Sequence, residues 1–160
     1  MISLDTQKAI AAPADFTSGF TEKVDSVRQA LEQKFDVPIA HDRDMNYSNG
    51  QKLCLGLGES GSLCVREAAD YEIHLYVSSK ATLFSIRLLN RVGANEWKPI
   101  VGPDLPRSSS SSIQQVGEAL TSLGYGEVPE SELYEIVPDQ FTEMDGAPAT
   151  VFDVLFSELA

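Results

Sequence analysis

The fold of this chain is decided by a stretch of two patterned runs and the turn between them, Tyr71-Glu-Ile-His-Leu-Tyr-Val77, Ser78-Ser-Lys-Ala81 and Thr82-Leu-Phe-Ser-Ile-Arg-Leu-Leu-Asn90. Apolar and polar residues alternate in both runs, which is typical of strands because successive side chains point to opposite faces. The stretch therefore predicts an antiparallel β-hairpin. Ile73 and Ile86 are expected on an apolar core face, and Glu72 on an opposite face that is largely solvated.

A second hairpin is predicted ahead of the central one. Apolar residues alternate with smaller ones over 53–57 and 63–65, on either side of a Gly58-Glu-Ser-Gly61 turn. If this turn is centred on Glu59, Cys54 faces Cys64 within disulfide reach. We expect this pair to be reduced, because two cysteines are too few for a disulfide scaffold and suit a reducing compartment.

The same turn contains Gly56-Leu-Gly-Glu-Ser-Gly61, which matches the GxGxxG dinucleotide fingerprint. In that fingerprint the glycines open a helix whose N-terminus approaches the pyrophosphate. Here a strand pattern follows, and Glu59 places a negative charge where phosphate would lie. We therefore interpret these glycines as turn residues.

Helices are predicted on both sides of the hairpins. Segment 16–35 carries apolar residues at spacings of four, three, four and four, and segment 112–124 has Ser112 as its cap and Gly124 at its end. A shorter helix is predicted between Pro129 and Pro138, with Ile136 inward and its glutamates outward. Segment 150–159 opens with a capping-box pattern and is apolar around most of its circumference, so it is either a core helix or half of a dimer contact.

Together these elements predict one α+β domain over residues 1–160, in which 108–160 is an acidic, helical last third. The two consecutive hairpins form an antiparallel sheet of four to five strands, the fifth being an edge strand over 96–101 that contains Pro99. The N-terminal helix and the C-terminal helices are expected to cover the apolar face of this sheet.

The charge is unevenly distributed along the chain. Up to Arg107 there are 14 acidic and 12 basic residues, whereas from Ser108 onward there are ten acidic residues and no lysine or arginine. A field of one sign attracts basic partners and repels nucleic acid and anionic membranes, and it also keeps a protein soluble. We expect a basic protein partner to bind at Glu127, Glu130, Glu132, Glu135, Asp139, Glu143 and Asp145.

The sequence offers little catalytic or metal-binding chemistry. His41, Asp42 and Asp44 are neighbours in a predicted loop with no second histidine nearby, so we interpret them as solvated. Neither histidine belongs to a recognisable triad or zinc motif. We therefore expect no enzyme, no metal and no cofactor. No secretory signal or membrane span is apparent either, so a cytoplasmic protein is expected.

In size and acidity the chain resembles the immunity proteins with which bacteria neutralise their own nuclease-type toxins, and the stretch Gly124–Leu159 is similar to the ends of such proteins. This resemblance implies an inhibitor that is a monomer when free and binds a basic toxin. Type III secretion chaperones are also similar in length, in acidity and in starting with one helix followed by antiparallel strands. They work as dimers around an extended effector segment. A housekeeping enzyme or ligand-binding domain is a third interpretation.

Overall fold

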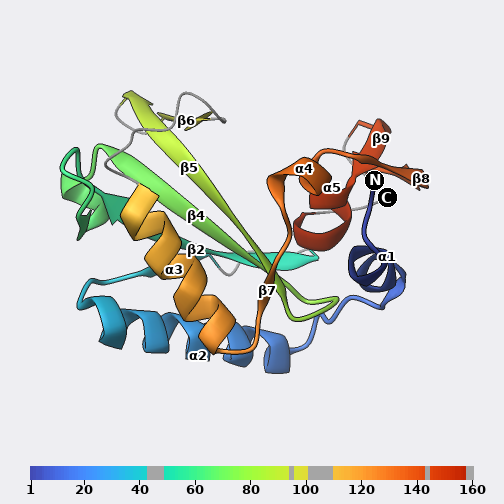
Figure 1. Ribbon diagram of the computed structural model, residues 1–160, viewed down its shortest axis with the longest axis horizontal. Coiled ribbons are helices and arrows are strands. Elements are labelled where there is room, and N and C mark those ends of the chain that lie inside the picture. Colours follow the sequence, from blue (N-terminus) through green and yellow to red (C-terminus); the bar gives the residue numbers. More distant parts are fainter. Residues whose placement is uncertain (43–48, 94–95, 101–109, 143–144, 158–160) are drawn as a thin grey trace.

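The computed structural model describes residues 1–42, 49–93, 96–100, 110–142 and 145–157 of the chain (Figure 1). Its centre is an antiparallel sheet with the strand order β1-β2-β4-β5-β6. These strands are β1 (Ala40–Asp42), β2 (Gly50–Leu57), β4 (Tyr71–Ser78), β5 (Leu83–Gly93) and β6 (Glu96–Ile100). Two short strands complete it at the margins: β3 (Leu63–Cys64) pairs with β2, and β7 (Gly126–Glu127) runs parallel to the start of β5. The predicted α+β class is confirmed, with seven strands instead of four to five.

The central hairpin is confirmed as β4 and β5. In its register Ile73 lies opposite Leu88, and Leu75 lies opposite Ile86. The front face of the sheet, which carries these residues, forms a hydrophobic core with apolar residues of β2. The predicted edge strand is also confirmed, because Pro99 lies in β6 at the end of the strand order.

Two helices cover the front face of the sheet: α2 (Ser18–Phe35) contacts β2, α3 (Ser110–Ser122) contacts β5, and the helices contact each other (Figure 1). The predicted spacing in α2 places Phe20, Val24, Val27 and Leu31 in the core. Helix α3 begins before Ser112, so this serine is not its cap. Instead the Ser112 hydroxyl donates to the carbonyl oxygen of Gly61. Gly124, with a φ of 94°, adopts the left-handed conformation just after α3, which glycine tolerates best.

Five of the remaining elements contribute to a second hydrophobic cluster. They are α1 (Leu4–Ala11), α4 (Glu130–Leu133), β8 (Ile136–Phe141), β9 (Pro148–Thr150) and α5 (Val151–Phe156). The short helix η1 (Arg66–Ala68) lies outside this cluster. Helix α5 begins with the predicted capping box between Thr150 and Asp153. It packs on the back of the sheet, where the rings of Phe152 and Tyr76 are 4.9 Å apart at their centres. Its apolar circumference is thus buried within the chain.

The second predicted hairpin is confirmed, because β3 pairs with β2, on the side of β2 that faces away from β4. Its turn was predicted one residue too early. It is centred on Ser60, since Leu57 pairs with Leu63, so Cys54 does not face Cys64. Across the β2–β4 pairing Cys54 lies opposite His74. The prediction for the segment after Pro129 is also wrong.

That segment forms only one helical turn, α4, before β8 begins. Ile136 is 54% exposed instead of inward, and Glu132 is buried instead of outward. Strand pairing with β9 overrides the helical pattern here, because Ile136 pairs with Thr150. The last third is therefore not wholly helical, and the sequence analysis also missed α1.

We expect Ile73→Ala to lower the free energy of unfolding by about 2–5 kcal/mol, because this fully buried side chain leaves a cavity between β4 and its covering helices. Val92→Ala is the matched control on the same hairpin, where the side chain is exposed, and it should change stability by less than about 0.5 kcal/mol. Urea denaturation of both variants measures the difference. Similar losses would contradict the register described for β4 and β5.

Candidate functional site

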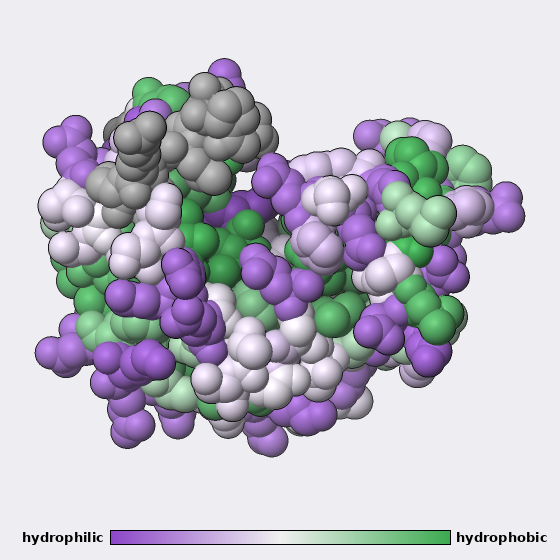
Figure 2. All heavy atoms as spheres, in the orientation of Figure 1, coloured by the Kyte–Doolittle hydropathy of each residue, from purple (hydrophilic) through white to green (hydrophobic). Residues whose placement is uncertain are grey.

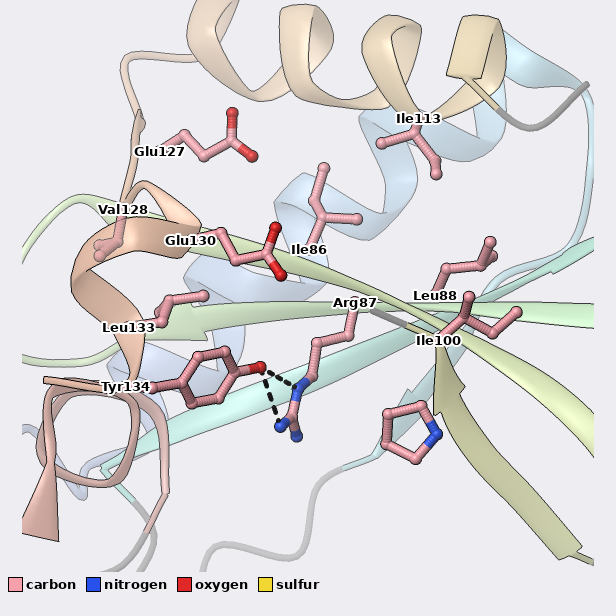
Figure 3. A pocket seen from close by; sticks show the side chains of 11 residues that line it. Ile86, Arg87, Leu88, Ile100, Ile113, Glu127, Val128, Glu130, Leu133 and Tyr134 are labelled. Atoms are coloured by element: carbon pink, nitrogen blue, oxygen red, sulfur yellow. Dashed lines mark hydrogen bonds between the residues drawn. The ribbon is translucent and has the colours of Figure 1, made fainter. Parts of the chain in front are cut away.

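A cleft lies where β5, β6, α3 and α4 meet, and two of the predicted acidic residues line it (Figure 3). Its volume is about 180 Å³. Figure 2 shows this hollow between the part of the molecule that carries α3 and the part that carries α4, with hydrophobic residues at its floor. The floor and walls are formed by Ile86, Leu88, Ile100, Ile113, Val128 and Leu133.

The carboxylates of Glu127 and Glu130 occupy one side of the cleft. Glu127 ends β7 and Glu130 begins α4, so Val128 and Pro129 alone separate them in the chain. Both side chains point toward the cleft near Ile86 (Figure 3). Within the described part of the chain, neither carboxylate has a cation or a hydrogen-bond donor. Glu127 is exposed, but partial desolvation of its carboxyl group by the surrounding protein raises its pKa.

Arg87 and Tyr134 form the opposite side of the cleft. The Arg87 guanidinium donates through Nε and Nη2 to the Tyr134 hydroxyl, at 3.3 and 3.2 Å. The same guanidinium lies 4.5 Å from the ring centre of Phe152, a cation–π distance that fixes its position. Arg87 therefore leans away from the two glutamates, toward α5 (Figure 3).

The other predicted acidic residues have different surroundings. Glu132 is only 7% exposed, and its carboxylate accepts from the Ser3 amide at 2.7 Å and the Thr6 hydroxyl at 2.8 Å. Burial opposes its charge, but these donors outweigh that effect and keep the pKa of Glu132 below its usual value. Glu132 thus attaches α1 to the rest of the chain and adds little to the surface.

Glu135 accepts from the amino group of Met1, so it too is engaged within the chain. Asp139 is exposed on β8. Asp145 closes the turn between β8 and β9, where it accepts from the Ala147 amide at 3.0 Å. Glu143 lies outside the described residues. The structure therefore brings Glu127 and Glu130 together and separates them from the other described members of the predicted set.

A second cluster of functional side chains lies on the back face of the sheet, which the sequence analysis expected to be solvated. Glu72 is 1% exposed and His74 is 7% exposed, so this expectation is wrong. The Glu72 carboxylate accepts from Arg66 Nε and Nη2 at 2.9 and 3.0 Å, and from His74 Nε2 at 2.7 Å. The burial of this face explains why the charge is paired so closely, because an isolated buried carboxylate is costly.

Cys54 completes this back-face cluster, because the β2–β4 register places it directly opposite His74. The thiol, the Glu72 carboxylate and the His74 imidazole each present an atom within 4.8 Å of the others. Burial raises the pKa of the Cys54 thiol to about 12. Burial and then the nearby Lys52 charge lower the pKa of His74, which keeps the imidazole neutral.

Sequence reasoning missed the back-face cluster for a definite reason. Glu72 and His74 share a strand face, and this i, i+2 spacing was visible in the sequence. Their partner Cys54 was assigned to Cys64 instead, because the centre of the turn between β2 and β3 was misplaced.

His41 lies on β1, where its imidazole contacts the Gln51 side chain.

Comparison with known proteins adds no identification. No protein-family model matches the chain, no curated protein matches it, and no solved structure matches its fold. In the portion of the chain that the structure describes, no helix combines the length and apolar character needed to span a bilayer.

We expect Glu132→Gln to lower the free energy of unfolding by about 1.5–3 kcal/mol at pH 7, because charged hydrogen bonds to α1 are weakened. The pKa of Glu132 is lower in the folded chain than its ordinary value of 4.5. Its charge therefore stabilises the fold above that value, and the contribution disappears as the pH falls through the lowered pKa.

The difference between the wild-type chain and Glu132→Gln should accordingly shrink below pH 4.5. The neighbouring Glu130→Gln is the control, since Glu130 is exposed and should leave stability nearly unchanged. Denaturant unfolding from pH 7 to pH 3 measures both variants. A Glu130→Gln effect as large as that of Glu132→Gln would contradict the assigned roles.

Proposed function

We propose that this protein binds a basic protein partner and neutralises it, as an immunity protein neutralises a nuclease-type toxin. The observation that carries the proposal is the pair Glu127 and Glu130, two carboxylates that no cation of the described residues contacts, in a cleft with an apolar floor. They belong to a region, from Ser108 onward, that has ten acidic residues and no basic one. A basic partner balances the charge of the two carboxylates in the cleft and the charge of the acidic region around it.

The cleft suits the side chain of a lysine or arginine from the partner. Such a side chain has an aliphatic stem and a charged end, so it buries the stem on apolar surface while the charge seeks an anion. In this proposal the stem lies along Ile86 and Ile113 and the charge lies between Glu127 and Glu130, because all four residues line the cleft. Apolar walls lower the local dielectric, so this ion pair is stronger than one on an open surface.

The wider acidic field has a separate role, which is to accelerate encounter with the partner. Charges that stay solvated, such as Asp139, add little to affinity but steer a basic protein toward the surface. The same field repels nucleic acid. The substrate of a nuclease-type toxin would therefore not occupy the surface that the toxin needs to bind.

A type III secretion chaperone is the second candidate, since antiparallel strands follow α2 as they follow the first helix of those proteins, although here α1 precedes α2. That function requires a dimer. The apolar stripe of α5 is buried inside the chain, with Phe156 only 2% exposed, and so it does not offer the dimer surface that such a chaperone needs. Light scattering in dilute solution separates the two: a monomer supports the inhibitor, and a stable dimer supports the chaperone.

The proposal is tested with the purified polypeptide encoded by the gene next to that of this chain. We expect Glu127→Gln combined with Glu130→Gln to raise the Kd for that polypeptide about tenfold or more, since the partner's cation loses both of the carboxylates that line the cleft. Glu22→Gln combined with Glu67→Gln removes the same net charge from exposed positions outside the cleft, and should change Kd by less than about twofold at 150 mM salt.

Calorimetry at low and high salt measures these affinities, and growth of cells expressing the neighbouring polypeptide measures neutralisation. If both double variants weaken binding equally, the partner's cation does not bind in the cleft, and only the overall negative charge of the chain contributes to affinity. If the neighbouring polypeptide is not toxic, or is toxic and this chain gives no protection, the inhibitor function is wrong.

A further inference from the structure

We propose that Cys54, Glu72 and His74 on the back of the sheet form a binding site for a transition-metal cation of the zinc type. The proposal is independent of the acidic cleft and of the function proposed for it. It depends on the identity of the three donors, on their proximity and on the strands that hold them.

The three donors converge without any rearrangement of the backbone. Cys54 on β2 and His74 on β4 are directly paired across the sheet, and Glu72 precedes His74 by two residues on the same face of β4. One donor atom from each residue lies within 4.8 Å of the other two. All three side chains are buried on paired strands of the same sheet, which position ligands more rigidly than loops.

The donor set selects the kind of metal. Sulfur and imidazole nitrogen with one carboxylate oxygen suit Zn²⁺, whose bonds to these atoms are about 2.0–2.3 Å long. Ca²⁺ and Mg²⁺ prefer sites made of oxygen alone, which this cluster does not provide. Among the described residues, this is the one group of three or more donors that lies close enough together. Three protein ligands also leave a fourth position for water or an exogenous ligand.

Arg66 is the competitor for this site. Its guanidinium holds both oxygens of Glu72, so it supplies the positive charge that a metal would otherwise bring. Arg66 extends from the short helix η1, and its side chain is 43% exposed, so it can withdraw into solvent while the strands stay in place. Metal binding therefore competes with the Arg66–Glu72 ion pair for the Glu72 oxygens, and removal of Arg66 should favour the metal.

The orientation of His74 supports the same assignment. Its Nε2 points at Glu72, at 2.7 Å, and thus toward the centre of the cluster. Metal binding at Nε2 requires the ring proton to move to Nδ1, and the Cys54 thiol releases its proton to solvent in the same event. The opposite nitrogen, Nδ1, lies 3.5 Å from the Tyr76 hydroxyl. Ligating histidines are commonly held by such a contact at their second nitrogen, which fixes the ring for the metal.

The test is titration of the metal-free, reduced full chain with Co²⁺, followed by competition with Zn²⁺. A bound cobalt–thiolate bond produces charge-transfer absorption in the near ultraviolet, which should saturate at one equivalent. Cys54→Ser should remove this absorption and His74→Gln should weaken binding about 100-fold or more, because even outer partners of a metal cost roughly 10–100-fold. Cys64→Ser, which alters the other thiol, should leave it unchanged.

Arg66→Gln gives the most specific result. This variant should bind Co²⁺ about tenfold more tightly than the wild-type chain, because Glu72 no longer forms an ion pair with Arg66. Circular dichroism checks that each variant is folded, and Cys54→Ala replaces Cys54→Ser if the buried hydroxyl prevents folding. The proposal is overturned if the wild-type chain shows no saturable thiolate absorption. It is also overturned if that absorption survives Cys54→Ser or is lost in Cys64→Ser.

Discussion

The burial of β4 on both faces is the constraint on which the rest of the structure depends. Its front face carries Ile73, Leu75 and Val77, which need only apolar neighbours and obtain them from the sheet and its two covering helices. Its back face carries Glu72, whose charge must be balanced because water does not reach it. Arg66 meets that need, because its guanidinium reaches both Glu72 oxygens from the short helix η1. Back-face contacts between Tyr76 and α5 complete the second layer.

Much of the fold follows from local patterns in the sequence. Alternation over 71–90 specified the central hairpin, and the apolar spacing in 16–35 specified α2, because these patterns reflect the two periods of strand and helix. The capping box between Thr150 and Asp153 was likewise predicted from neighbouring residues alone. The predictions failed where distant residues decide the outcome. Ile136 follows a helical spacing, yet pairing with Thr150 places it in a strand, and no local rule contains that partner.

The candidate sites divide in the same way. Clustering of acidic residues after Ser108 is a property of composition and could be predicted, whereas the cleft that brings Glu127 and Glu130 together depends on how β7 joins β5. The back-face cluster depends on a cross-strand register. A turn centred one residue earlier gave Cys54 the wrong neighbour, since a shift of one residue in a turn moves every pair across the two strands. Burial of Glu72 could not be predicted because its cover comes from segments outside the hairpin.

The attachment of α5 to the start of β2 has a consequence for the order in which this chain folds. Asn49 donates from its side chain to the Val154 carbonyl at 2.9 Å, a contact between residues 105 positions apart. Gly50 is required beside it, because a Cβ there would lie 2.6 Å from the Val77 carbonyl oxygen. Contacts of such separation carry a large loop-closure cost and form late. During synthesis Tyr76 therefore stays uncovered until α5 has left the ribosome, and throughout that interval the back face of the sheet exposes apolar surface on which chains can aggregate.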